Sequence, residues 1–189
     1  MKLDEFKGDE NDDEDVSTLI PDIPEYLSTR DEKKKGQCQL YAAALLINIE
    51  DPEAARYLIQ KSQTLPPQSM AYKYLTKGGV FADFLRINTN YTIAKVKRKK
   101  LLAEQYLLYL QNKELDEKWI LILKDHNGSE HHAVGFDCKT QLIYDSCEKK
   151  AMKMSLENLS RCCGRNNMFH SIKLMVQLVQ KPLSQKRKK

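Results

Sequence analysis

The stretch Cys38-Gln-Leu-Tyr-Ala-Ala-Ala-Leu-Leu-Ile-Asn-Ile49 is apolar on nearly every side of a helix. A helix of this kind is buried in a core, whereas a surface helix keeps one polar face. We therefore expect a buried central helix that begins near Cys38. Its unbroken apolar run, Leu40 to Ile47, has eight residues, against the roughly 20 that cross a bilayer. We expect no membrane association.

The segments on either side predict an α+β fold. Pro52 at a first helical position, with Asp51 as N-cap, opens a second helix to about Gln63. Further helices are expected at 69–76, 80–87, 101–111 and 155–162. Runs rich in β-branched and aromatic residues predict strands at 119–123, 132–136, 141–144 and 168–179, with an edge strand at 91–97. The expected architecture is a helical half followed by an antiparallel meander.

The 189 residues suit one domain with charged ends. Residues 1–15 hold eight acids and two lysines, a composition that disfavours folding. We assign 1–27 to an acidic, disordered arm and extended lead-in, 28–180 to the folded domain, and 181–189 to a basic tail. The tail has the composition of a nuclear address or of a weak nucleic-acid contact.

Five cysteines, an odd number, indicate a reduced, intracellular protein, cytoplasmic or nuclear. Zinc is a competing chemistry for the set Cys138, Cys147, Cys162, Cys163 and His170. No Cys-x₂-Cys knuckle occurs among them, so the sequence predicts neither a metal site nor a cofactor.

Cys38 is the candidate nucleophile, because a thiol in the first turn of a helix meets the positive end of the helix dipole. Alternatively, Cys38 is only a small residue of the core. Of the histidines, His132 shares a strand face with Val134 and Phe136, which we expect to pack toward the helical half and Cys38. Asp145 ends the next apolar run and would orient the imidazole; its alternative role is to open a turn.

The order of these residues resembles that of a known protein family. The order Gly36-Gln37-Cys38 before a buried helix, His132-Ala133-Val134-Gly135-Phe136 on a strand, and a later Asp145 resembles papain-like cysteine proteases. The likeness is to their compact forms, such as bacterial effector proteases and bacteriocin-leader peptidases. It implies a papain-like fold and a thiol protease that cleaves a peptide or isopeptide bond in a protein or peptide substrate.

The resemblance further implies Cys38 as nucleophile, His132 as general base and acid, and Asp145 as the residue that orients His132. The same logic serves an acyltransferase or a transglutaminase, which the sequence does not separate from a hydrolase. The glutamine that the family places shortly before the cysteine is missing. That departure favours a third alternative, a catalytically inactive relative that binds a protein or nucleic acid.

Overall fold

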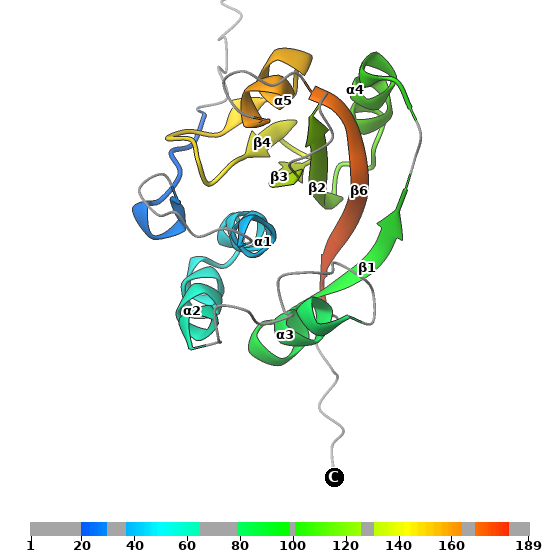
Figure 1. The fold of residues 1–189 in the computed structure, drawn as a ribbon. Coiled ribbons are helices and arrows are strands. Elements are labelled where there is room, and N and C mark those ends of the chain that lie inside the picture. Colours follow the sequence, from blue (N-terminus) through cyan, green and yellow to red (C-terminus); the bar gives the residue numbers. More distant parts are fainter. Residues whose placement is uncertain are drawn as a thin grey trace, which may run out of the picture.

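Six antiparallel strands form the central sheet, and helices cover both of its faces (Figure 1). The computed structural model describes residues 20–29, 37–64, 79–98, 101–125, 131–163 and 169–181. The strands are β1 (Tyr91–Lys97), β2 (Lys118–Asp125), β3 (His131–Asp137), β4 (Leu142–Tyr144), β5 (Met152–Lys153) and β6 (Phe169–Gln180). The α+β class expected from the sequence is confirmed.

The strand order, β1-β6-β2-β3-β4-β5, is not the simple meander that we expected. Strands β2 to β5 follow one another, but β6 inserts between β1 and β2. The reason lies in the side chains of β6: Val176 and Leu178 pack into the core on one face, whereas Ile172 and Met175 pack into the core on the other. A strand that is buried on both faces belongs in the middle of a sheet. Strand β5 was not expected.

The helices are α1 (Cys38–Asn48), α2 (Pro52–Gln63), α3 (Val80–Asn88), α4 (Ala103–Gln111) and α5 (Leu156–Cys162), with a 3₁₀ turn η1 (Glu25–Leu27). The expected caps form: the Asp51 carboxylate accepts from the Ala54 N–H at 3.0 Å, and the Ser155 hydroxyl accepts from the Asn158 N–H at 3.1 Å. The expected helix at 69–76 lies outside the described residues. Among those residues, no helix has the length and apolar character needed to cross a membrane.

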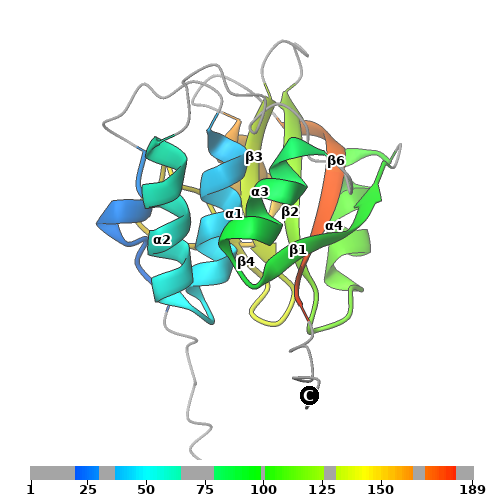
Figure 2. The same cartoon turned by 90° about the horizontal axis from the view of Figure 1, so that it is seen from below.

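Two cores lie on the two faces of the sheet. On one face α1 packs against β2, β3 and β4, with α2 and η1 beyond it and α3 against β1; Figure 2 shows α1 alongside β3. On the other face α4 and α5 pack against β6. Because α1 is covered from several sides, Leu40 to Ile47 are all buried, as the sequence predicts.

The segment before α1 is hydrogen-bonded to the loop between β4 and β5. The Ile23 N–H donates to the Lys149 carbonyl at 2.8 Å, and the Ala151 N–H donates to the Pro21 carbonyl at 2.9 Å. Leu27 is fully buried. The described part of the lead-in, from residue 20, therefore packs against the folded domain.

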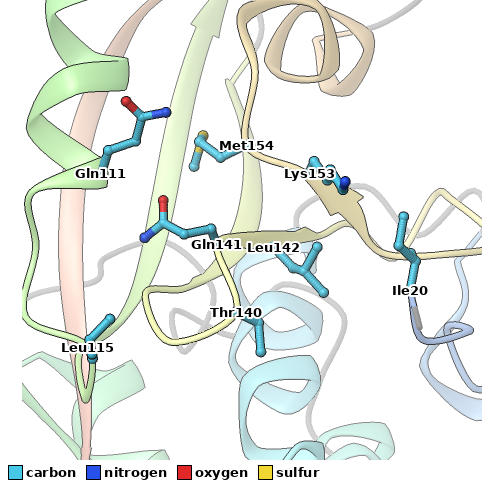
Figure 3. A pocket seen from close by; sticks show the side chains of 8 residues that line it. All are labelled: Ile20, Gln111, Leu115, Thr140, Gln141, Leu142, Lys153 and Met154. Atoms are coloured by element: carbon cyan, nitrogen blue, oxygen red, sulfur yellow. The ribbon is translucent and has the colours of Figure 1, made fainter. Parts of the chain in front are cut away.

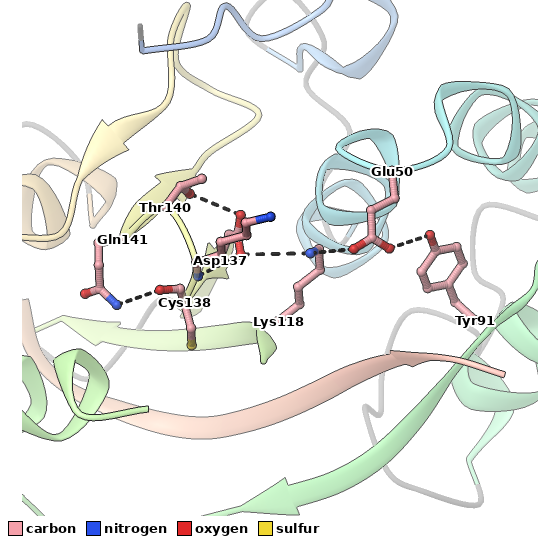
Figure 4. Close-up of polar contacts among 8 residues, drawn as sticks. Glu50, Tyr91, Lys118, Asp137, Cys138, Thr140 and Gln141 are labelled. Atoms are coloured by element: carbon pink, nitrogen blue, oxygen red, sulfur yellow. Dashed lines mark hydrogen bonds and ion pairs between the residues drawn. The ribbon is translucent and has the colours of Figure 1, made fainter. Parts of the chain in front are cut away.

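A polar network fixes the far end of α1 (Figure 4). Lys118 on β2 places its Nζ 2.8 Å from Oε1 of Glu50 and 3.9 Å from Oδ1 of Asp137. The Tyr91 hydroxyl on β1 donates to Oε2 of Glu50 at 3.1 Å. The turn after α1 is thereby tied to three strands, which fixes the position of the helix along the sheet.

The approach of α1 to β3 requires a glycine. A Cβ added at Gly135 would lie 2.8 Å from Cγ of Leu46 and 3.2 Å from the Ala42 carbonyl oxygen. Both distances are shorter than ordinary van der Waals contact. Only a residue without a side chain fits at this position with α1 where it lies.

We expect Gly135→Ala to destabilise the fold by about 1 to 3 kcal/mol, because the new methyl group overpacks the contact with Leu46. Urea unfolding would measure the change. Leu46→Ala is the matched partner: the double variant should lose less than the sum of the two single variants, since truncating Leu46 removes the clash. Strict additivity would contradict this account of the contact.

Candidate active site

Cys38 is the first residue of α1, and its thiol is half-buried. The first helical hydrogen bonds run from the N–H groups of Leu40 and Tyr41 to the Gln37 carbonyl, at 2.9 and 3.1 Å. The N–H groups of Cys38 and Gln39 therefore have no acceptor within the helix, as is general for a first turn. They direct positive potential toward the end of the helix where the thiol lies.

His132 lies between the other two predicted residues. Its Nε2 is 2.8 Å from Oδ1 of Asp145, and the Cys38 thiol hydrogen-bonds the same ring. Since Asp145 occupies Nε2, Nδ1 is the ring nitrogen left for Cys38. Asp145 directly follows β4, and the register pairs Tyr144 with Gly135. This register places Asp145 diagonally across from His132, within reach of its ring. The structure thus brings together the three residues singled out in the sequence.

The reason we gave for His132 is wrong, although the residue meets its expected partners. Val134 and Phe136 pack into the core that contains α4 and α5. The face of β3 toward α1 carries Ala133 and Gly135 instead. A helix can approach a strand closely only over small residues, so the bulky pair faces away. His132 lies at the beginning of β3, next to the strand's first residue.

His132 and Asp145 shift each other's pKa, and Cys38 contributes to the shift of His132. Burial lowers the pKa of His132, but the hydrogen bonds and charges of Asp145 and Cys38 outweigh burial and hold it well above the ordinary value of 6.5. Burial raises the pKa of Asp145, but His132, the Cys147 N–H and the Cys162 thiol lower it below the ordinary value of 3.8. An ionised Asp145 beside a protonated His132 is therefore the favoured state near neutral pH.

Asp145 is only 2% exposed, and further groups hold it in place. The Cys147 N–H donates to Oδ1 at 2.9 Å, and the Cys162 thiol, from α5, hydrogen-bonds the carboxylate. The Thr29 N–H donates to the Ser146 carbonyl at 2.8 Å and ties this turn to the segment before α1. The sequence suggested a turn at this point as an alternative role for Asp145; the residue both begins the turn and meets His132.

The contact with Cys162 was not foreseen. The sequence placed Cys162 in the last turn of a helix and considered it only as a zinc ligand. Its contact depends on how α5 docks against the loop after β4, which no local pattern specifies.

A cluster of potential metal ligands overlaps the candidate site. Within the described residues, His132, Asp145 and Cys147 offer ligand atoms that all lie within 4.8 Å of one another. This group shares Cys147 with the zinc candidates of the sequence, but the His132 and Asp145 atoms are hydrogen-bonded to each other at 2.8 Å. The chemistry visible here is that of a histidine oriented by a carboxylate.

A pocket of about 460 Å³ lies elsewhere on the molecule (Figure 3). Thr140 and Gln141, in the turn between β3 and β4, line it together with Ile20 and Met154. The β3–β4 turn is at the opposite end of β4 from Asp145, and the pocket lining includes no residue of the Cys38–His132–Asp145 group. Pocket size therefore does not locate the candidate site, whereas the side-chain geometry does.

Comparison of this chain with models of known protein families and with curated proteins gives no match. The assignment of the site consequently depends on its residues and their geometry.

The ion pair predicts a window of stability. Asp145 contributes stability above its ordinary pKa of 3.8 that is lost as the pH falls through its lower folded value. His132 contributes stability below its ordinary pKa of 6.5 that is lost as the pH rises through its higher folded value. We expect the difference in unfolding free energy between wild type and His132→Gln to be largest from about pH 4 to 6.5. Denaturant titrations of both proteins across pH would measure it, and a difference independent of pH would contradict the pairing.

Proposed function

We propose that this chain is a papain-like cysteine hydrolase that cleaves a peptide or isopeptide bond through Cys38, His132 and Asp145. One observation carries the proposal: the His132 ring is bonded on one side to a buried carboxylate and on the other to a thiol at a helix N-terminus. A nucleophile, a base and a group that orients the base, in hydrogen-bond contact, are the arrangement that thiol catalysis requires.

The proposed reaction starts from a Cys38 thiolate beside the protonated His132, the pair that forms when the thiol proton passes to the ring. The sulfur then attacks the carbonyl carbon of the substrate, so that a C–S bond forms and the carbonyl oxygen becomes negative. The Cys38 N–H, which has no acceptor within the helix, would donate to that oxygen. His132 gives its proton to the leaving amine as the C–N bond breaks, and a thioester remains.

Hydrolysis of the thioester completes the cycle. His132, whose side chain is 22% exposed, accepts a proton from water as the water oxygen attacks the thioester carbon. The C–S bond breaks and Cys38 leaves as the thiolate. Throughout, the Asp145 charge stabilises the imidazolium and holds Nε2, so that Nδ1 keeps facing the sulfur.

The architecture also supports the proposal. A helix carries the thiol at its first residue and packs against an antiparallel sheet that carries the histidine and the carboxylate. This agrees with the resemblance to compact papain-like proteases. The substrate class implied is a protein or peptide segment, because the thiol lies at the end of α1 and is half-buried rather than enclosed.

Selective alkylation tests whether Cys38 is activated. At pH 7 iodoacetamide or a thiol-reactive peptide probe should label Cys38 faster than the exposed thiol of Cys147, because His132 and the helix N-terminus favour the thiolate. Mass spectrometry would identify the labelled residue. His132→Ala should abolish the preference, with His131→Ala as the matched control that keeps it. Equal, slow labelling of all five cysteines would refute the proposal.

Asp145→Asn tests the orienting role separately. The variant keeps the side-chain shape but removes the charge that stabilises the imidazolium, and we expect a loss of about 10 to 10³ in kcat/KM on a cleavable peptide. Circular dichroism would establish that the variant folds. Cys38→Ala should show no covalent turnover. If Asp145→Asn matches wild type, Asp145 serves only the turn.

A further inference from the structure

Asp145 receives a hydrogen bond from a side chain that the proposed chemistry does not use. The Cys162 thiol lies in the last turn of α5 and bonds the Asp145 carboxylate. Cys162 is 7% exposed and Asp145 2%, so the contact is shielded from water. A hydrogen bond to a buried charge counts for more than the same bond at the surface.

Helix α5 is fastened so that this contact is maintained. Arg161, adjacent to Cys162, donates through Nε and Nη2 to the two carboxylate oxygens of Glu148 at 2.8 and 2.7 Å. The Glu148 N–H in turn donates to the Asp145 carbonyl at 3.0 Å. Two consecutive residues of α5 therefore bind two residues of one turn, which fixes both the distance and the rotation of the helix.

The thiol is in the protonation state that a donor needs. Burial raises the pKa of Cys162, and the Asp145 charge and hydrogen bond raise it further, well above the ordinary value of 9.0. Cys162 thus remains an S–H group at neutral pH. It is neither a second nucleophile nor a ready metal ligand, since both of those roles need the thiolate.

We propose that Cys162 is a positioning residue of the active site: its thiol donates to the Asp145 carboxylate and holds it aligned with Nε2 of His132. This inference rests on the proposed function for its catalytic meaning. The hydrogen bond favours the ionised carboxylate, and that carboxylate in turn orients the imidazole. Cys162 would act through Asp145 alone and would touch no substrate.

The groups around His132 and Asp145 come from several elements. Cys38 approaches His132 from α1, and Cys162 and Arg161 come from α5, with Glu148 and Cys147 in the turn after Asp145. The Cys147 N–H is a backbone donor that a side-chain substitution leaves in place. Replacing Cys162 alone therefore removes one donor from Asp145 and leaves its other partners unchanged.

The test compares Cys162→Val, which has similar volume and no donor, with Cys162→Ser, which keeps a hydroxyl donor. The His132 ring proton is followed by NMR from pH 2 to neutral pH, and the resonance is identified by its loss in His132→Gln. Protonation of Asp145, 2.8 Å from Nε2, produces an inflection at acid pH. We expect the valine variant to move this inflection upward by about 0.5 to 1 pH unit, because a donor to the charged form is lost.

Cys162→Ser should keep the inflection near its wild-type position. Cys138→Val is the matched control, because it removes another buried thiol, next to the β3–β4 turn and away from Asp145. A merely structural role for Cys162 would lower stability in the valine variant but leave the inflection where it is. An unchanged inflection in Cys162→Val, or an equal shift in Cys138→Val, overturns the inference.

Alkylation of Cys38 by iodoacetamide gives the second readout. In the valine variant its rate at pH 7 should fall about 3- to 30-fold, because a carboxylate that has lost one donor holds His132 less firmly in place. The two proposals fail in different ways. An unreactive Cys38 in the wild type refutes the hydrolase, whereas the NMR titration decides the role of Cys162 in either case.

Discussion

The close packing of α1 on β3 determines the position of the candidate nucleophile. Gly135 allows the helix to approach within contact distance of the strand, and α1 runs in the same direction as β3, with Leu46 beside Gly135 and Cys38 beside His132. The network of Glu50 and Lys118 holds the other end of the helix. If the helix lay farther from the strand, Cys38 would lose contact with His132 even though every element of the fold remained.

The alignment of the candidate site also requires that the buried Asp145 carboxylate has hydrogen-bond donors to its oxygens. Removing a carboxylate from water is costly unless its oxygens find donors. Asp145 meets this requirement with donors from three places in the chain: the imidazole of His132 on β3, the N–H of Cys147 in its own turn, and the thiol of Cys162 on α5. The site is thus assembled from both faces of the sheet, and its alignment depends on the docking of helices that never approach the sulfur.

Local signals in the sequence were enough to predict several helices and strands and part of the candidate site. The all-apolar stretch from Cys38 predicted α1, Asp51 and Pro52 marked the start of α2, and the lengths of the apolar runs located β3 and β4. The short hairpin between these strands made a contact of His132 with Asp145 predictable. What depends on distant packing was not predictable: the face of β3 that α1 covers was wrong, because small residues rather than bulky ones meet the helix. The place of β6 in the sheet and the partner of Cys162 also depend on contacts far apart in the chain.

The position of β6 has a consequence for how the protein is made. Strand β6 pairs with both β1 and β2, which precede it in the chain by more than 40 residues. Until 169–180 leave the ribosome, β1 and the edge of β2 that β6 later covers have no native partner and are open to wrong pairing. Helix α5, which packs on β6 and binds the Asp145 turn through Arg161, lacks part of its packing surface until then. A growing chain would therefore contain Cys38, His132 and Asp145 before the central strand of the sheet beneath them, and the candidate site would gain its full support only with the last strand of the domain.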